Sequence, residues 1–236
     1  MRFRDDMTVE LIDHMGGDAS VIAAARVSTR AARSKEDFLA DPKENAGLIN
    51  FLMKGRHGSP FEHNAMTFYV EAPIFVFREW HRHRIGFSYN EWSSRYSQLE
   101  PTFYLPNTQR NMQQIGKPGH YEFVPGTQEQ YDDFIARNMI HSERAYNLYE
   151  DQLAKGIAKE VARMCLPVNI YSAMYVTLNA RSCMAFLSLR TKREDSTFPS
   201  YPQREIEMCA EQVEGAFAQL FPLTYAAFNR NGRVCP

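Results

Sequence analysis

The stretch RHRIGFSYNEWSSRY, residues 82–96, concentrates cationic and hydroxyl side chains in a pattern that suits the binding of an anion. Its basic residues are Arg82, His83, Arg84 and Arg95. The whole chain, by contrast, is close to neutral, with 27 Lys and Arg against 28 Asp and Glu. Glu79 and Glu91 are the only acids between residues 72 and 99, too few to neutralise these arginines together with Arg78. The local excess of positive charge therefore predicts a ligand.

The side chains around the arginines indicate what kind of ligand this is. Aromatic residues flank them on both sides, namely Phe75, Phe77, Trp80, Phe87, Tyr89, Trp92 and Tyr96. A guanidinium beside aromatic surface suits a planar, anionic ligand that is stacked and paired at once. Ser93 and Ser94 add two hydroxyls beside Arg95, a good donor set for phosphate. A purely structural role is the alternative, because cations near the end of a helix over 73–84 gain about 0.3–1 kcal/mol each from the helix dipole.

Histidines near this stretch raise the question of a metal site. His57, Glu62 and His63 lie close together in the sequence, and His81 and His83 are two residues apart. Helical zinc pairs use i,i+4 spacing, whereas histidines two apart on a helix point in different directions. No metal site is therefore expected.

Nucleophilic catalysis has weak support. The serines that could serve are Ser88, Ser93 and Ser94, but no GxSxG elbow is present. The cysteines are Cys165, Cys183, Cys209 and Cys235, which form no CxxC pair. Free thiols are expected, without a disulfide framework or a thiolate zinc site.

A second set of arginines lies further along the chain, at Arg163, Arg181 and Arg190. On an unbroken helix, Arg181 and Arg190 would point to opposite sides and lie roughly 13 Å apart along the axis. They cannot serve the same small group. They either make independent surface pairs or reach different ligands or different subunits.

The composition bounds the class of protein. The 236 residues are 44% hydrophobic and 23% charged, which is ordinary for a globular chain and suits one large domain or two small ones. The near-neutral balance argues against a binder of nucleic acid polymers. No apolar run is long enough for a membrane span and no secretory signal is apparent, so a cytoplasmic protein without a membrane partner is expected.

The elements that must position these residues are predicted from periodicity and from Gly and Pro. Helices are predicted over 18–32, 42–58, 73–84, 181–190 and 204–221, and over 128–163 with a break at Gly156. Strands or extended segments are predicted over 7–15, 65–72 and 166–180, and loops over 106–127 and 191–203. Few strands among many helices, without regular alternation, favour an α+β fold.

Several segments together resemble the flavin-dependent thymidylate synthases, also called the alternative thymidylate synthase family. The signature of that family is Arg-His-Arg, then seven or eight residues, then Ser; here eight residues separate Arg84 from Ser93. Further similar segments follow in the same order: HGSPFEH (57–63), APIFVFREW (72–80), EVARMCLPVNIY (160–171) and NARSCMAFLSLR (179–190). The resemblance covers roughly residues 5–190 and the last helix.

The resemblance implies a fold and a reaction. The fold would be helices around a small, mostly antiparallel sheet, in a single domain over residues 1–236, assembled as a homotetramer whose active sites are shared between subunits. The reaction would be reductive methylation of dUMP to dTMP. Methylenetetrahydrofolate would supply the carbon, and FAD reduced by NADPH would supply the hydride.

The resemblance also implies site residues. Those expected to contact FAD are Ser59, Arg82, His83, Arg84, Glu91, Asn179 and Arg181. Those expected to contact dUMP are Glu79, Arg82, Glu91, Trp92, Ser93, Ser94, Arg95, Arg163 and Arg190. Arg190 would be catalytic, since a cation at the uracil edge favours charge developing at N3 and O4 and so polarises C5. No cysteine nucleophile is then needed.

Some features depart from the family pattern. Ala185 stands where some relatives carry a polar, flavin-contacting side chain. No histidine lies between Arg190 and Ile206, and the 191–203 segment looks longer than in compact members. Two other hypotheses remain: a protein that binds RNA or single strands through its arginine and aromatic residues, and a flavin- or nucleotide-binding relative without synthase activity.

Overall fold

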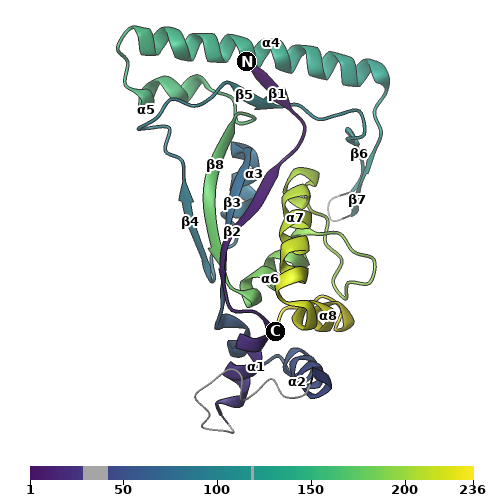
Figure 1. Ribbon diagram of the computed structural model, residues 1–236. Coiled ribbons are helices and arrows are strands. Elements are labelled where there is room, and N and C mark those ends of the chain that lie inside the picture. Colours follow the sequence, from purple (N-terminus) through teal and green to yellow (C-terminus); the bar gives the residue numbers. More distant parts are fainter. Residues whose placement is uncertain (29–41, 118–119) are drawn as a thin grey trace. The chain divides into compact units, whose positions relative to one another are not determined.

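The computed structural model describes residues 1–28, 42–117 and 120–236, and their elements group into two units (Figure 1). The first unit contains Met1–Asp6, Ala72–Phe77 and Trp92–Ser172. The second contains the described residues of Met7–Glu71, Arg78–Glu91 and Ala173–Pro236. A single domain over residues 1–236 remains a prediction.

A four-stranded sheet, most of it in the second unit, has the order β2-β3-β8-β4. Its strands are β2 (Thr8–Met15), β3 (Ala65–Pro73), β8 (Tyr171–Leu178) and β4 (Phe87–Glu91). The pairings of β2 with β3 and of β4 with β8 are antiparallel. The predicted α+β fold with a mostly antiparallel sheet is therefore confirmed.

The two faces of this sheet differ in burial because side chains alternate along a strand. Met66, Phe68 and Val70 of β3 are almost completely buried. The opposite face of the sheet is more open: there the hydroxyls of Thr67 and Thr177 lie 2.9 Å apart across the sheet. One side of the sheet therefore forms the core, and the other is polar and partly exposed.

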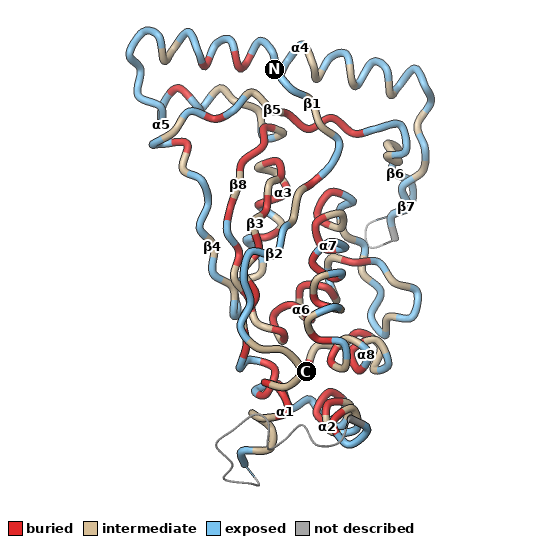
Figure 2. The backbone as a smooth tube through the Cα atoms, in the orientation of Figure 1, coloured by how far each residue is buried: buried red, intermediate tan, exposed pale blue. Residues whose placement is uncertain are grey.

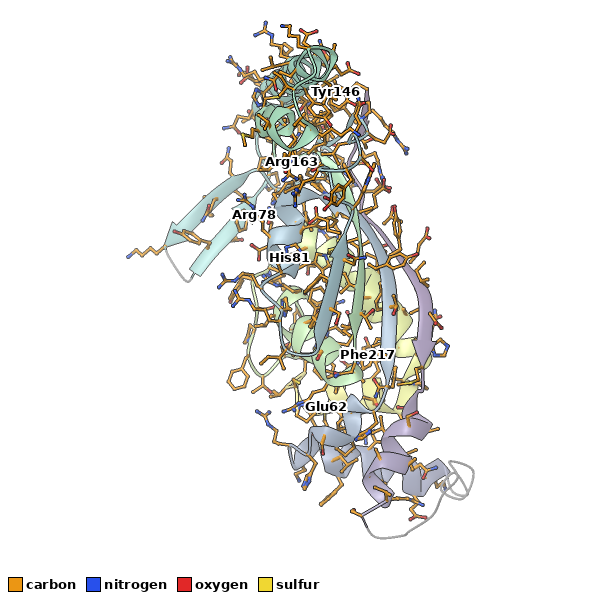
Figure 3. The ribbon with its side chains drawn as sticks, turned by 90° about the vertical axis from the view of Figure 1, so that its left-hand side faces the viewer. Glu62, Arg78, His81, Tyr146, Arg163 and Phe217 are labelled. Carbon is orange, nitrogen blue, oxygen red and sulfur yellow. The ribbon has the colours of Figure 1, made fainter. Side chains whose placement is uncertain are left out.

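Three C-terminal helices lie on the buried side of the sheet (Figures 1 and 3). They are α6 (Ala180–Arg190), α7 (Arg204–Leu220) and α8 (Pro222–Arg230). Trp80 stacks on Phe186 of α6 with ring centroids 4.3 Å apart, and Phe217 of α7, labelled in Figure 3, is fully buried. Figure 2 shows that the inward sides of these helices are buried and that most of β2 is exposed.

Shorter helices complete the second unit. They are α1 (Asp18–Arg26), α2 (Pro42–Lys54) and the 3-10 helix η2 (Ser59–Glu62). The Asp18 carboxylate accepts hydrogen bonds from the backbone N–H groups of Leu223 and Thr224 at 2.7 and 3.0 Å, and so caps the start of α8.

The first unit is built around a long helix, α4 (Gln128–Ala154), labelled in Figure 1. Its start carries a capping box between Thr127 and Gln130. Short strands β1 (Arg2–Arg4) and β5 (Thr102–Tyr104) pair in parallel, and β6 (Gln113–Lys117) pairs with β7 (His120–Val124). The chain then forms α5 (Lys159–Ala162) and the 3-10 helix η3 (Arg163–Cys165). The buried core of this unit consists of Leu99, Phe103, Tyr146, Tyr149, Ala162 and Ile170.

Several predicted elements are corrected by the structure. The predicted loop over 106–127 contains the β6–β7 hairpin. The helix predicted over 73–84 is α3 (Ile74–Trp80), so it ends before the Arg-His-Arg motif. The helix predicted over 42–58 ends at Lys54, since Gly55 and Arg56 (φ 60°) leave the helical conformation. Strand β4 and helix α8 were not predicted, and the predicted helix over 18–32 reaches residues outside the described part of the chain after Ser28.

Other predicted elements are confirmed. The strands over 7–15 and 65–72 match β2 and β3, and the helix over 181–190 matches α6. The expected break at Gly156 follows α4, where the glycine adopts φ 79°. Among the described residues, no helix is both long and apolar enough to cross a membrane.

Candidate active site

Arg190, the predicted catalytic residue, is the last residue of α6 and is held by two residues of the second unit. Its Nη1 lies 2.7 Å from the carboxylate of Glu79. Its Nε donates to Nε2 of His83 at 3.0 Å, and its Nη2 lies 3.4 Å from the carbonyl oxygen of Glu79. The Arg190 side chain is only 16% exposed. The guanidinium is therefore fixed in direction by partners far from it in the sequence.

His83 acts as a neutral acceptor in this arrangement. Burial, followed by the nearby Arg190 charge, lowers the pKa of His83 from 6.5 to about 4. Because Nε2 accepts a hydrogen bond from Arg190, the proton of the neutral ring lies on Nδ1. The Tyr89 hydroxyl lies 2.8 Å from the carbonyl oxygen of His83 and 2.6 Å from that of Trp80. Tyr89 therefore fixes the backbone of the Arg-His-Arg motif.

The arrangement leaves part of the Arg190 guanidinium available for a ligand. A guanidinium has five N–H donors. Three are directed at Glu79 and His83, which leaves one N–H on each terminal nitrogen without a partner in the described part of the chain. These remaining N–H groups can donate to acceptors of a planar ligand.

Arg181 lies near the other end of α6 and contacts different groups, as its spacing from Arg190 predicts. Its Nη1 pairs with the Glu62 carboxylate at 2.5 Å, and its Nε donates to the carbonyl oxygen of Pro236 at 2.7 Å. Gly58 allows this position, because a Cβ there would lie 2.5 Å from Cζ of Arg181. Glu62 was a candidate only as a metal ligand, and its pairing with Arg181 was not predicted. Its position three residues after Ser59, a candidate FAD contact, could have indicated that it lies near the site.

Asn179, predicted to contact FAD, caps the start of α6. Its side-chain oxygen accepts a hydrogen bond from the N–H of Ser182 at 2.8 Å. The Ser182 hydroxyl donates to the carbonyl oxygen of Ile85 at 2.9 Å, and a Cβ at Gly86 (φ 70°) would lie 2.2 Å from that hydroxyl. Gly86 therefore permits the close approach of the Arg-His-Arg loop to α6.

The remaining FAD-contact candidates of the second unit are exposed. Arg82 and Arg84 are exposed and make no ion pair among the described residues. Arg78, labelled in Figure 3, is also exposed. Ser59 is exposed at the start of η2, and Glu91 is exposed at the end of β4. Unpaired, solvated guanidinium groups of this kind are available to an anionic ligand.

The first unit brings together most of the residues predicted to bind phosphate. Arg163 of η3, labelled in Figure 3, donates to the Ser94 hydroxyl at 2.5 Å. Arg95 pairs with Glu160 at 2.8 Å, with both side chains about half exposed. The Ser93 hydroxyl lies 3.4 Å from the backbone N–H of Arg95, and Trp92 is 37% exposed. Hydroxyl and guanidinium donors therefore converge here, while their role toward phosphate remains a prediction.

Two supporting residues of this set were missed by sequence reasoning. Glu160 pairs with Arg95. Lys159 donates from Nζ to the carbonyl oxygen of Tyr96 at 2.9 Å and so holds the chain next to Arg95. Glu160 and Lys159 lie three and four residues before Arg163, and this spacing could have indicated that they lie near it.

The cysteines and the possible metal ligands of the described residues were also compared with the predictions. The four cysteines are free, as predicted. Burial raises the pKa of the Cys209 thiol to about 12 and that of Cys183 well above its usual value, so both stay protonated. Within the described residues, no group of three or more His, Cys, Asp or Glu side chains could hold a metal ion.

Comparison with known proteins places these features in context. Residues 10–223 match the family described as thymidylate synthase complementing protein. The chain is 57% identical to a flavin-dependent thymidylate synthase of Streptomyces avermitilis, over 99% of this chain and 95% of that protein. It is 54% identical to one of Tropheryma whipplei, over 99% of this chain and 97% of that protein. A solved structure, the UMP/dUMP methylase PolB from Streptomyces cacaoi bound with 5-Br dUMP, matches with a TM-score of 0.93, 49% identity and complete coverage of both chains.

Proposed function

The chain belongs to the thymidylate synthase complementing protein family, and from this premise we propose that it methylates dUMP to dTMP as a flavin-dependent thymidylate synthase. The similarity to flavin-dependent thymidylate synthases and to a dUMP methylase over nearly the whole chain supports this reaction. Methylenetetrahydrofolate is the proposed carbon donor, FAD the cofactor and NADPH its reductant.

The observation that carries the proposal is the fixed guanidinium of Arg190. Its two remaining N–H groups can donate to O4 of a uracil ring, and to N3 once N3 has lost its proton; negative charge held at these atoms favours C5 as a carbon nucleophile. Because Glu79 and His83 hold the guanidinium beforehand, little reorganisation is needed during the reaction. This role requires no thiolate, in keeping with the protonated thiols of Cys183 and Cys209.

The second unit also fits the chemistry of FAD, which carries a diphosphate and a planar ring. The exposed guanidinium groups of Arg82 and Arg84 are free for an anion among the described residues, and Gly58 leaves room for that of Arg181. We assign these three arginines to FAD, together with Ser59, His83, Glu91 and Asn179. When bound and reduced, FAD supplies the hydride. The chain's own residues orient the ring and keep the uracil beside it.

The Ser94 and Arg163 pair suits the phosphate of dUMP. A hydroxyl and a guanidinium are good donors for phosphate oxygens, and Ser93 and Arg95 add further donors. We assign this set, with Trp92, to dUMP, together with Glu79, Arg82, Glu91 and Arg190 of the second unit. A homotetramer whose active sites combine residues of different subunits is part of the proposal.

UMP is a second candidate substrate. The similar PolB structures contain 5-Br dUMP in one case and 5-Br UMP in the other, at 49% and 47% identity to this chain. Both nucleotides are therefore tested as substrates.

The reaction is tested with purified protein, FAD, NADPH, methylenetetrahydrofolate and either dUMP or UMP, with the methylated nucleotide detected by mass spectrometry. We expect dTMP from dUMP only when every component is present. Arg190→Ala should lower kcat by about 10²–10³-fold, as loss of a donor to developing charge does in other enzymes, and should leave FAD binding largely intact.

Arg230→Ala is the matched control, because Arg230 is likewise the last residue of its helix and is exposed. It should retain wild-type turnover. Absence of dTMP from correctly folded protein that binds FAD would indicate a relative without synthase activity. Binding of long oligonucleotides without FAD binding would support the nucleic-acid alternative.

A further inference from the structure

The end of α6, where Arg190 lies, is closed by the next residue. Thr191 adopts an extended conformation and is 1% exposed. Its backbone N–H and its hydroxyl both donate to the carbonyl oxygen of Leu187, at 3.1 and 2.6 Å. The last turn of a helix otherwise leaves carbonyl groups without partners and frays easily. Thr191 therefore holds the turn that carries Arg190.

Thr191 is in turn held by a buried arginine from the C-terminal segment. Nη2 of Arg233 donates to the Thr191 hydroxyl oxygen at 2.9 Å, and Nη1 pairs with the Glu214 carboxylate of α7 at 2.7 Å. The Arg233 side chain is 2% exposed and lies over the Phe228 ring at 4.9 Å. Its backbone has φ 57°, and its Nε is buried without a partner in the described chain. Both features cost stability, so this arginine is not placed here by backbone preference.

Glu214 ties the arrangement to the loop after α6. Its second carboxylate oxygen accepts from Nη2 of Arg193 at 2.6 Å, and Tyr225 donates its hydroxyl to the first oxygen at 3.0 Å. Thr191, Glu214 and Arg233 form a set that we name the α6 anchor. Each of the three is at most 5% exposed, so none of them can touch a nucleotide or a flavin.

We propose that the α6 anchor positions Arg190 for the reaction. This inference rests on the proposed function, in which Arg190 donates to the pyrimidine. The anchor fixes the helical turn from Leu187 to Thr191, and that turn sets where the Arg190 guanidinium meets Glu79 and His83. A misplacement of about 1 Å in an active site costs on the order of 10²-fold in rate. Arg233 and Glu214 are therefore positioning residues that act through Thr191.

The test replaces Thr191 by valine, which has nearly the same shape but no hydroxyl. Thr191→Val removes the two hydroxyl bonds, to Leu187 and to Arg233, and keeps the backbone N–H bond to Leu187 and the Glu214–Arg233 ion pair. We expect kcat for dTMP formation to fall roughly 10- to 100-fold, with the thermal midpoint lowered. Thr191→Ser keeps the hydroxyl and should restore kcat.

Thr224→Val is the matched control. The Thr224 side chain is also fully buried, and its hydroxyl donates to Asp18 at 2.6 Å, away from the end of α6. This variant should lose thermal stability like Thr191→Val but keep the wild-type kcat. Equal kcat losses in both variants, or unchanged kcat in Thr191→Val, would overturn the anchor role.

A second variant and a structural readout keep the inference testable if Thr191→Val folds poorly. Arg233→Lys keeps the charge beside Glu214 but cannot also reach Thr191, so it should reproduce the kcat loss. In a crystal structure of either variant, we expect the 3.0 Å contact between Arg190 Nε and His83 Nε2 to be lost. A retained contact contradicts the inference, whereas wild-type protein that makes no dTMP contradicts only the proposed function.

Discussion

His83 shows how one residue of a basic motif can serve without carrying charge. A histidine between two arginines is easily counted as a third cation, yet its partial burial and the adjacent Arg190 lower its pKa to about 4. The neutral ring accepts the Arg190 Nε–H, which a protonated ring could not do. The chemistry of the motif is thus decided by a contact that lies outside the motif.

The lowered pKa of His83 predicts how stability depends on pH. Between pH 4 and pH 6.5 the unfolded chain binds more protons at this histidine than the folded chain does, so the free energy of unfolding rises with pH across this window. The contribution is complete above pH 6.5 and is lost as the pH falls toward 4. Urea unfolding across the window should show a shallower rise for His83→Gln. The exposed His141→Gln in α4 should retain the wild-type slope, and identical slopes for all three proteins would contradict the prediction.

Gly58 is predicted to control the position of Arg181. The backbone of Gly58 has φ −76°, which alanine adopts without strain, and the nearest atoms that the Cβ of Gly58→Ala would meet belong to the Arg181 guanidinium. Displacing a charged hydrogen-bond donor costs about 1.5–3 kcal/mol, so FAD affinity should fall about 10- to 100-fold in a fluorescence titration.

Gly47→Ala is the control for this change. A Cβ at Gly47, in the exposed part of α2, would meet nothing within 4 Å. This variant should gain about 0.5–1 kcal/mol of stability, as alanine does over glycine inside a helix, and should leave FAD affinity unchanged. Unchanged FAD affinity in Gly58→Ala would show that Arg181 need not lie against this glycine.

At the scale of elements, α6 combines the two groups of candidate residues. Asn179 caps its start, Arg181 lies in its first turn and Arg190 ends it. The helix is almost completely buried along its middle, where Cys183, Met184, Phe186 and Leu187 pack, so its two ends are where it can reach ligands. Arg181 and Arg190 are nine residues apart, which is two and a half helical turns, so this one helix directs their side chains to opposite sides.

Asn179 is predicted to have two separable roles at the start of α6. Asn179→Ala removes the cap of Ser182 and should lower the free energy of unfolding by about 1 kcal/mol, measured by urea denaturation. Asn179→Asp keeps an oxygen for the cap and should retain stability. Its added negative charge should nevertheless weaken FAD binding, because the cofactor is anionic. An aspartate variant that binds FAD normally would remove Asn179 from the proposed flavin contacts.

At the scale of the whole molecule, the two units are assembled from segments that alternate along the chain. The first unit takes residues from three separate stretches, and the second does so as well. The candidate residues are divided in the same way: Arg190, Glu79 and His83 belong to the second unit, and Ser94 and Arg163 to the first. An oligomer with shared active sites would bring such sets together from different copies of the chain.

This sharing predicts complementation between inactive variants. Arg190→Ala and Arg163→Ala should each be nearly inactive alone. If one active site takes these arginines from different subunits, then mixed oligomers formed by co-expression should regain activity in about a quarter of their sites on random assembly. Turnover of the co-purified mixture measures this. A mixture no more active than the separate variants, with mixed oligomers demonstrated by differently tagged subunits, would contradict sharing between subunits.

The sequence by itself determined the features that depend on neighbours along the chain. The α+β class, the strands at 7–15 and 65–72 and the helix at 181–190 follow from alternating or helical periodicity, and the break after α4 follows from Gly156. The family resemblance also rests on short, ordered motifs. The β6–β7 hairpin was missed because its segment is rich in amides and glycines, which favours the prediction of a loop.

Only the tertiary structure decided which groups meet. Arg190 contacts Glu79 and His83, 111 and 107 residues earlier, and Arg163 contacts Ser94, 69 residues earlier. Arg233 reaches Thr191 across 42 residues through a left-handed backbone that no local preference predicts. Contacts of this kind depend on how elements pack, and periodicity, which reports only which face of an element is buried, does not specify the partner on the other side.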